Sequence, residues 1–253
     1  MILMDKMVDE LRVKVYPSRE EMGREAAKET AEAIRALLAE KGRVGMIFAA
    51  APSQNEFLAA LCEEPDIDWG RVDAYHMDEY VGLAPDAPQG FGNFLRRAIF
   101  GRLPFGSVHY LPTMGDPEAS CRDYEALLAE ADPQIVCMGI GENGHIAFND
   151  PAVADFRDPR LVKPVGLDEI CRMQQVHDGC FASLDLVPKT ALSLTIPALL
   201  RPRYVFCMVP AATKANAVKG TVEGPITEKC PASILRTKKG ARLYLDRDSS
   251  ALL

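Results

Sequence analysis

A histidine and a carboxylate share the segment GIGENGHIAFNDP, which runs from Gly139 to Pro151. His145 has an acidic neighbour in Asp150, five residues further along the chain. A carboxylate within reach of an imidazole orients the ring and holds one of its tautomers. An imidazole that titrates near neutrality is an effective general acid and base. We therefore predict that His145 is catalytic and that Asp150 is its partner.

The same segment carries three glycines, Gly139, Gly141 and Gly144, in the pattern G-x-G-x-x-G. In a dinucleotide-binding turn this pattern leads directly into a helix whose N-terminus faces the pyrophosphate. The sequence that follows, HIAFNDPAV, is a poor helix because Asn149 and Pro151 disfavour a helix interior. We therefore predict no nucleotide cofactor, and we expect the glycines to let the backbone pass close to a ligand or to another loop.

Two further acids, Asp78 and Glu79, end the strand-like run RVDAYHMDEY at residues 71–80. Adjacent residues on a strand point to opposite faces, so at most one of the two can enter a given pocket. The other is then free to cap a helix, to pair with a cation or to face solvent. The run also leaves open that both acids are solvated charges at the edge of a loop.

Lys214 stands at the start of a helix-like stretch, TKANAVKGTVEG, where the helix dipole disfavours a cation. The position is explained if the lysine and the helix terminus together hold an anion, above all a phosphate. An ordinary surface lysine is the alternative. The segment AAPSQNE follows another apolar run and offers Ser53 and Gln54 as further hydrogen-bond donors at a helix start.

Apolar runs and helix-like segments alternate along the chain. Strands are predicted at residues 11–16, 43–50, 71–80, 134–141, 190–195, 204–210 and 241–246, and helices at 18–42, 53–64, 116–130 and 213–224. The first helix has Ser18 and Glu21 in a capping-box pattern and ends on Gly42. This alternation predicts an α/β fold in three layers, with a mainly parallel sheet that helices cover on both faces. Ligands of such sheets bind beyond the carboxyl ends of the strands, where all these polar segments stand.

The composition excludes several classes of protein. The net charge is −7 and the basic residues are scattered, which argues against a nucleic-acid partner. The seven cysteines form no C-x-x-C motif, which indicates free thiols in a reducing compartment and no zinc site. We find neither a signal peptide nor an apolar stretch near the roughly 20 residues that span a membrane. We expect a cytoplasmic protein with one domain over residues 1–253 and an inserted lid or subdomain at about 151–189, the least regular part.

Four segments together resemble one known family. HMDEYVGL and GIGENGHIAFNDP, roughly 60 residues apart, are similar to the signature segments of the glucosamine-6-phosphate deaminase/isomerase family, and VPKTALSLTIPALL and TKANAVKGTVEG are similar to its later segments. The resemblance covers nearly the whole chain. It implies a modified Rossmann-like fold that binds no nucleotide, and an enzyme of the hydrolase/isomerase type that needs no metal or organic cofactor. Its reaction would convert glucosamine 6-phosphate to fructose 6-phosphate and ammonia. The family includes monomers and hexamers, so a homo-oligomer remains open.

The resemblance also implies roles for individual residues. Asp78 would move a proton between C2 and C1 of the sugar, His145 would open the sugar ring with Asp150 in support, and Lys214 would hold the phosphate. We expect the catalytic group to include Asn143 and Glu142 as well. The expected substrate-binding residues are Ser53, Gln54, Glu79, Gly141, Gly144 and Lys214.

The chain departs from the family pattern at several places in the expected site. Asn143 stands where the family has an aspartate beside the histidine, which leaves Glu142 as a substitute, and Asp150 stands where the family has a glutamate. AAPSQNE replaces a glycine-rich phosphate loop, and HDGCF lacks an arginine that the family uses to clamp phosphate. These changes leave open another amino-sugar phosphate as substrate or a plain isomer as product. They also leave open two other functions, a sugar-phosphate-binding relative without turnover and a 6-phosphogluconolactonase.

Overall fold

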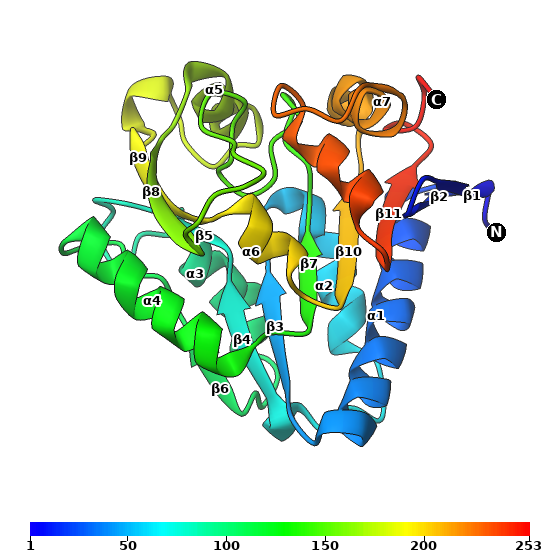
Figure 1. Cartoon of the computed structure of the whole chain (residues 1–253), viewed down its shortest axis with the longest axis horizontal. Helices are drawn as coiled ribbons and strands as arrows, with labels where there is room; N and C mark the ends of the chain where they lie inside the picture. Colours follow the sequence, from blue (N-terminus) through cyan, green and yellow to red (C-terminus); the bar gives the residue numbers. More distant parts are fainter.

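Eleven strands form two sheets in the computed structural model, which describes all of residues 1–253 (Figure 1). The strands are β1 (Met4–Val8), β2 (Leu11–Tyr16), β3 (Val44–Phe48), β4 (Val72–His76), β5 (Asp78–Tyr80), β6 (Ser107–His109), β7 (Ile135–Met138), β8 (Val162–Gly166), β9 (Thr190–Leu194), β10 (Tyr204–Val209) and β11 (Ala241–Asp246). The α-helices are α1 (Arg19–Lys41), α2 (Asn55–Cys62), α3 (Phe91–Leu95), α4 (Pro117–Ala131), α5 (Glu169–His177), α6 (Ile196–Leu200) and α7 (Ala215–Glu223).

The larger sheet has eight strands in the order β1-β2-β11-β10-β7-β3-β4-β6. Every neighbouring pair in it is parallel except β1 and β2, which form an antiparallel hairpin at one edge. Strands β4 and β6 extend from one side of β3, whereas β7, β10 and β11 follow on its other side. The direction of winding therefore reverses between β3 and β7, and such a reversal is where open α/β sheets bind their ligands.

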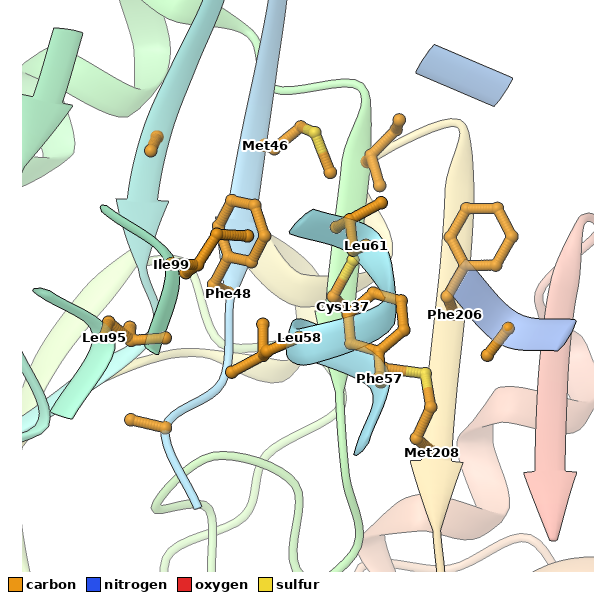
Figure 2. Close-up of a cluster of buried hydrophobic side chains, with 14 of the residues drawn as sticks. Met46, Phe48, Phe57, Leu58, Leu61, Leu95, Ile99, Cys137, Phe206 and Met208 are labelled. Carbon is orange, nitrogen blue, oxygen red and sulfur yellow. The ribbon is translucent and has the colours of Figure 1, made fainter. Parts of the chain in front are cut away.

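Helices cover both faces of this sheet, as the alternation of apolar segments predicts. Alternate residues of β3 enter two separate cores, with Met46 and Phe48 in one and Ile47 in the other. Helices α1, α2 and α3 pack on the first face, and α4, α6 and α7 on the second. Figure 2 shows the first core, where Phe57 and Leu61 of α2 lie against side chains of β3, β7 and β10. The α/β fold with three layers is confirmed.

Helix α1 begins and ends where its sequence predicts. The Ser18 hydroxyl accepts a hydrogen bond from the Glu21 backbone N–H, which satisfies a donor that the first turn leaves free. At the other end, Gly42 adopts a left-handed conformation with a φ of 79° and its N–H donates to the Leu38 carbonyl. Local sequence alone therefore fixes both ends of the longest helix.

The single strand predicted at residues 71–80 is wrong, because the chain changes sheets at Met77. β4 ends at His76 in the main sheet, and β5 pairs instead with β9 in an antiparallel sheet of the order β5-β9-β8. The predicted strand at residues 190–195 likewise belongs to this smaller sheet as β9. In Figure 1 the smaller sheet and α5 lie above the upper ends of the central strands. Asp78 thus starts a strand of the smaller sheet.

The segment at about 151–189 contains regular structure that its sequence did not reveal. It holds β8 and α5, and the Asp168 side chain caps α5 by accepting a hydrogen bond from the Cys171 backbone N–H. β1 was also missed, since three of its five residues are exposed and show no apolar alternation. All seven cysteines are free thiols. None of the helices has the length and apolar character needed to cross a membrane.

Candidate active site

A cavity of about 120 Å³ lies at the carboxyl ends of β3, β7 and β10 and beside the start of β5. Two groups of predicted site residues meet there, because both Asp78 and His145 line it. Lys214 lines the same cavity. The polar side chains on its wall are Arg19, Ser53, Gln54, Asp78, His145, Gln174, Gln175, Asp178, Thr213 and Lys214. The carboxylate, the imidazole and the ammonium that the sequence singles out therefore share one small space.

His145 is held in one orientation by its own loop. Its Nδ1 lies 2.8 Å from the Asn143 Oδ1 and 2.9 Å from the Asp150 Oδ1. The Asn143 amide nitrogen donates to the same Asp150 oxygen over 3.0 Å, so the amide oxygen is the end that faces the ring. Both oxygens beside Nδ1 are therefore hydrogen-bond acceptors. The proton of a neutral His145 ring therefore resides on Nδ1, and Nε2 is left as the basic nitrogen. This is the tautomer that can take a proton from a ligand in the cavity and return it.

The loop can bring the ring this close only because residue 141 is a glycine. A Cβ added at Gly141 would lie between 2.1 and 2.4 Å from atoms of the His145 ring. The Gly141 N–H also donates to the His145 carbonyl over 2.9 Å, which closes the loop on itself. At Gly141 the close approach is to a ring of the same loop, whereas Gly144 approaches another loop, because a Cβ there would lie 2.9 Å from the Cys230 Sγ.

Asp150 is almost completely buried behind the imidazole, with 1% of its surface exposed. Burial by itself raises the pKa of Asp150, but the hydrogen bonds and charge of His145 and the Asn143 amide outweigh it, so the pKa lies below its ordinary value. Asp150 is therefore ionised at neutral pH and stabilises a protonated imidazole. The imidazole keeps an acidic partner although Asn143 stands where the family has an aspartate, because Asp150 contacts the ring directly.

The surroundings of Asp78 disfavour the charged form of its carboxyl group. Asp78 is 7% exposed, and its carboxyl group receives no hydrogen bond from the protein. Burial and the neighbouring charge of Glu79 raise its pKa well above the ordinary value. A carboxylate with a raised pKa is a stronger base than one in water, and such groups cluster at catalytic sites.

Glu79 has a different position from the one that the sequence predicts. It lies outside the cavity, and its carboxylate accepts the backbone N–H groups of Tyr80, Phe91 and Gly92 at 2.8–3.0 Å. Burial raises the pKa of Glu79, although these three donors partly oppose the effect. Adjacent residues of β5 point to opposite sides, so only Asp78 faces the cavity. Glu79 holds the start of α3 in place, and its predicted part in substrate binding stays a prediction.

Strand β9 fixes both halves of the catalytic arrangement. The backbone of Ser193 is paired with Asp78 in the register of β5 and β9. The hydroxyl of the same Ser193 accepts the Phe148 N–H over 3.1 Å, and the Asn149 side chain donates to the Leu194 carbonyl over 2.8 Å. Strand β9 therefore positions Asp78 through backbone pairing. It positions the histidine loop through hydrogen bonds to Ser193 and Leu194.

The part of the cavity around Lys214 carries an unpaired cation. Lys214 is 5% exposed and forms no ion pair with any residue of the chain. Burial lowers the pKa of Lys214, while the nearby charges of Asp178 and Glu142 act in the other direction. A buried ammonium without a partner is unfavourable. This part of the cavity is therefore suited to an anion.

The backbone around Lys214 is strained where it borders the cavity. Ala211 has a φ of 83° and a ψ of 146°, a conformation that belongs almost entirely to glycine. Both oxygens of Asp246 accept the Ala211 N–H, at 3.2 and 3.1 Å, and so hold the turn. Ala147, with a φ of 47°, is a second such residue on the cavity wall. Strain of this kind persists where the surrounding structure requires it, and it is common at functional sites.

Ser53 and Gln54 line the cavity from the short helical turn of Pro52–Gln54. The Gln54 amide nitrogen donates to the Ser53 hydroxyl and to the Met208 carbonyl, both over 3.2 Å. Its oxygen is buried and has no hydrogen-bond partner. Both side chains thus line the same cavity as Lys214, and their part in substrate binding stays a prediction.

Five of the predicted site residues do not line the cavity, namely Glu79 and Asp150, described above, and Asn143, Glu142 and Gly144. Asn143 lies behind the ring of His145, where it orients that ring. Glu142 points towards the exposed His177, whose Nδ1 is 3.8 Å away. Gly144 has a φ of 86° and packs against Cys230. These contacts place Glu142 and Gly144 outside the cavity wall, and their predicted roles in catalysis and substrate binding stay predictions.

The sequence missed four polar residues of the cavity wall: Arg19, Gln174, Gln175 and Asp178. The last three come from α5 and from the residue that follows it. The Gln174 side chain accepts the Glu142 N–H over 2.9 Å and donates to Asp178 over 3.3 Å. A signal for α5 exists in LDE at residues 167–169, which places a capping aspartate before an acidic first turn.

His145, Asp150 and Cys171 are the one group whose donor atoms could together approach a metal ion, since these atoms lie within 4.8 Å of one another. The contact between His145 and Asp150 uses only Nδ1 and Oδ1, so His145 Nε2 and Asp150 Oδ2 are not engaged in it. Burial raises the pKa of the Cys171 thiol, and a protonated thiol is a weak ligand. These groups are better suited to hold a proton than a metal ion.

Comparison with known proteins shows which family the chain resembles. Residues 17–161 match the family described as glucosamine-6-phosphate isomerases/6-phosphogluconolactonase. A glucosamine-6-phosphate deaminase of Halothermothrix orenii is 31% identical over 96% of this chain and all of its own length. Another from Listeria innocua is 32% identical over 84% of this chain and 89% of its own.

Solved structures give the same relationship. A monomeric glucosamine-6-phosphate deaminase superposes with a TM-score of 0.87 at 28% identity, covering 95% of this chain and 99% of that one. A 6-phosphogluconolactonase from Thermotoga maritima reaches a TM-score of 0.76 at 20% identity over 93% of this chain and 99% of its own. At that identity the second structure shows a shared fold.

Proposed function

Because the chain belongs to the glucosamine-6-phosphate isomerase/6-phosphogluconolactonase family, we propose that it converts glucosamine 6-phosphate, or a related hexosamine 6-phosphate, to a ketose 6-phosphate and ammonia. One observation carries the proposal. A buried carboxylate, Asp78, an oriented imidazole, His145, and an unpaired ammonium, Lys214, line one cavity of about 120 Å³. A sugar phosphate needs these three groups for its C2 proton, its ring oxygen and its phosphate.

Ring opening is the task of His145. The cyclic sugar opens when a base removes the proton of the C1 hydroxyl and an acid protonates the ring oxygen. Nε2 of His145 can accept the first proton and deliver it to the oxygen, because Nδ1 keeps its own proton on Asn143 and Asp150. The ionised Asp150 stabilises the imidazolium that forms between the two steps.

Proton transfer between carbons is the task of Asp78. In the open chain the carboxylate removes the C2 proton, and the electron pair moves to give an enolamine. Return of the proton to C1 yields an imine at C2. Water adds to this imine and ammonia leaves, which forms the ketose. The last step is hydrolytic, and the two preceding steps are an isomerisation.

The phosphate binds at the part of the cavity around Lys214 in this proposal. Lys214 supplies a charge, and the Ser53 hydroxyl and the Gln54 side chain line the same cavity. Burial of Lys214 strengthens its interaction with an anion, because water screens that interaction less. This part of the cavity orients the sugar so that C1 and C2 meet Asp78 and His145.

A coupled ammonia assay across a panel of hexosamine 6-phosphates tests the proposal. We expect turnover with glucosamine 6-phosphate or galactosamine 6-phosphate, together with the corresponding ketose 6-phosphate. Absence of ammonia from every member of the panel would contradict the deaminase assignment. Thermal shifts with sugar phosphates but no product would then identify a binding protein, and acid release from 6-phosphogluconolactone would identify a lactonase.

We further propose that residues 151–189 act as a lid. Gln174, Gln175 and Asp178 from this segment form part of the cavity wall, so a movement of the segment would change access to the cavity. Limited proteolysis measures this directly. Cleavage within the segment should slow when fructose 6-phosphate is present, and an unchanged rate of cleavage would oppose the lid.

A further inference from the structure

We propose that Arg19 is the second cation of the phosphate-binding end and that it discriminates phosphorylated from unphosphorylated sugars; this inference rests on the function proposed above. A phosphate monoester carries close to two negative charges at neutral pH, since its second pKa is about 6. Lys214 supplies only one positive charge. Arg19 is the one other lysine or arginine on the cavity wall.

The packing of two helices brings Arg19 to this place. At Gly23 the helices α1 and α2 come so close that an added Cβ would lie 2.7 Å from the Glu56 Cβ. Arg19 stands one turn earlier on the same face of α1. It therefore reaches over the start of α2 to the turn that carries Ser53, which it joins on the wall of the cavity.

The guanidinium of Arg19 is held by three hydrogen bonds and keeps one nitrogen free. Nε and Nη2 donate to the two Glu56 carboxylate oxygens, each over 3.0 Å, and Nη2 also donates to the Pro52 carbonyl over 3.2 Å. Nη1 forms no hydrogen bond within the chain. A guanidinium fixed along one edge presents its remaining donors in a defined direction, which suits a phosphate oxygen.

The contacts of Arg19 have a simpler explanation, namely that the pair with Glu56 only fastens α1 to α2. The two explanations predict different results for the variant Glu56→Gln, which changes the partner of Arg19. That change weakens the fastening but keeps the positive charge of Arg19 beside the cavity. Arg19→Gln removes both the fastening and the charge. Arg24→Gln is the matched control, because Arg24 is an exposed arginine of the same helix that does not line the cavity.

The test measures KM for glucosamine 6-phosphate and the inhibition constant of inorganic phosphate in these three variants. We expect Arg19→Gln to raise both roughly 10- to 100-fold, the usual effect of losing a hydrogen bond to a charged group, with a smaller change in kcat. The kcat/KM for glucosamine without its phosphate should stay unchanged. Glu56→Gln should shift these constants much less, and Arg24→Gln should not shift them. Equal effects of Arg19→Gln and Glu56→Gln, or no effect of Arg19→Gln, would overturn the inference.

The outcome is separable from that of the proposed function. If the wild-type chain releases no ammonia, calorimetric titration with inorganic phosphate and with fructose 6-phosphate measures the same site without turnover. Weaker phosphate binding in Arg19→Gln, with binding retained in Arg24→Gln, would then support the role of Arg19 although the deaminase assignment fails. Equal binding by the wild type and Arg19→Gln would refute that role whether or not the chain is an enzyme.

Discussion

Replacement of Asp78 by asparagine should separate activity from stability. The change keeps the volume of the side chain and removes its ability to accept the C2 proton. A positioned general base contributes about 10²- to 10⁴-fold to a rate, so we expect kcat to fall by that factor. This loss corresponds to about 2.7–5.4 kcal/mol of transition-state stabilisation. Binding of the sugar phosphate should persist, because Lys214 and Ser53 are untouched.

The same replacement should make the folded protein more stable at neutral pH. Burial raises the folded-state pKa of Asp78 above its unfolded value. The folded state therefore favours the protonated form, and the group contributes its stability below the unfolded pKa of about 3.9 and loses it as the pH rises through the folded pKa. Asparagine carries no charge and avoids this loss. The variant's advantage in unfolding free energy should hence be largest above the folded pKa and shrink towards pH 4.

Both effects can be measured with one matched pair of variants. Turnover comes from the coupled ammonia assay, and unfolding free energy comes from denaturant titrations at several pH values. Glu79→Gln is the control, since it alters the adjacent carboxylate. It should destabilise the fold by about 1–3 kcal/mol, because three backbone donors of β5 and α3 lose a charged acceptor, and it should change kcat far less. Solvent deuterium still entering C2 in the Asp78→Asn variant would refute the role of Asp78 as the base.

Three further changes have expected outcomes. Lys214→Met should raise KM for the sugar phosphate roughly 10- to 100-fold and raise the melting temperature, because burial already lowers the lysine's pKa; a KM within twofold of the wild type would oppose phosphate binding there. Gly141→Ala should reduce kcat at least tenfold, since its Cβ would meet the His145 ring at 2.1–2.4 Å, and an unchanged steady-state rate would show that the loop yields freely. Ala211→Gly should stabilise the fold by about 1 kcal/mol in denaturant titrations through relief of its backbone strain, whereas a loss of stability would mean that the conformation is not strained.

The fold follows from local patterns wherever an element satisfies its own hydrogen bonds and buries one face. Helix α1 is such a case, since Ser18 and Gly42 mark its ends in the sequence as they do in space. The break at Met77 was not predictable in this way. The run 71–80 is continuous in its strand preference, and only pairing with β9, more than 100 residues later, draws Asp78–Tyr80 out of the main sheet. The exposed strand β1 lacked the apolar alternation that identifies a strand.

The candidate site was predictable where residue chemistry was unusual. Asp78, His145 and Lys214 carry groups that need a partner, and all three line the cavity. Arg19 gave no such signal, because it looks like an ordinary residue in the first turn of a helix and reaches the cavity only through the contact of α1 with α2. The side of β5 on which Asp78 falls required the register of the strand. A one-residue slip would have exchanged it with Glu79.

Strand β9 positions both of the proposed reacting groups. Its Ser193 pairs through the backbone with Asp78, and the hydroxyl of Ser193 accepts a hydrogen bond from the loop that carries His145. Substitutions elsewhere can thus remodel the far wall of the cavity while the spacing between base and imidazole stays constant. In the proposed function, the chemistry at C1 and C2 therefore depends on β9 and tolerates changes elsewhere on the cavity wall.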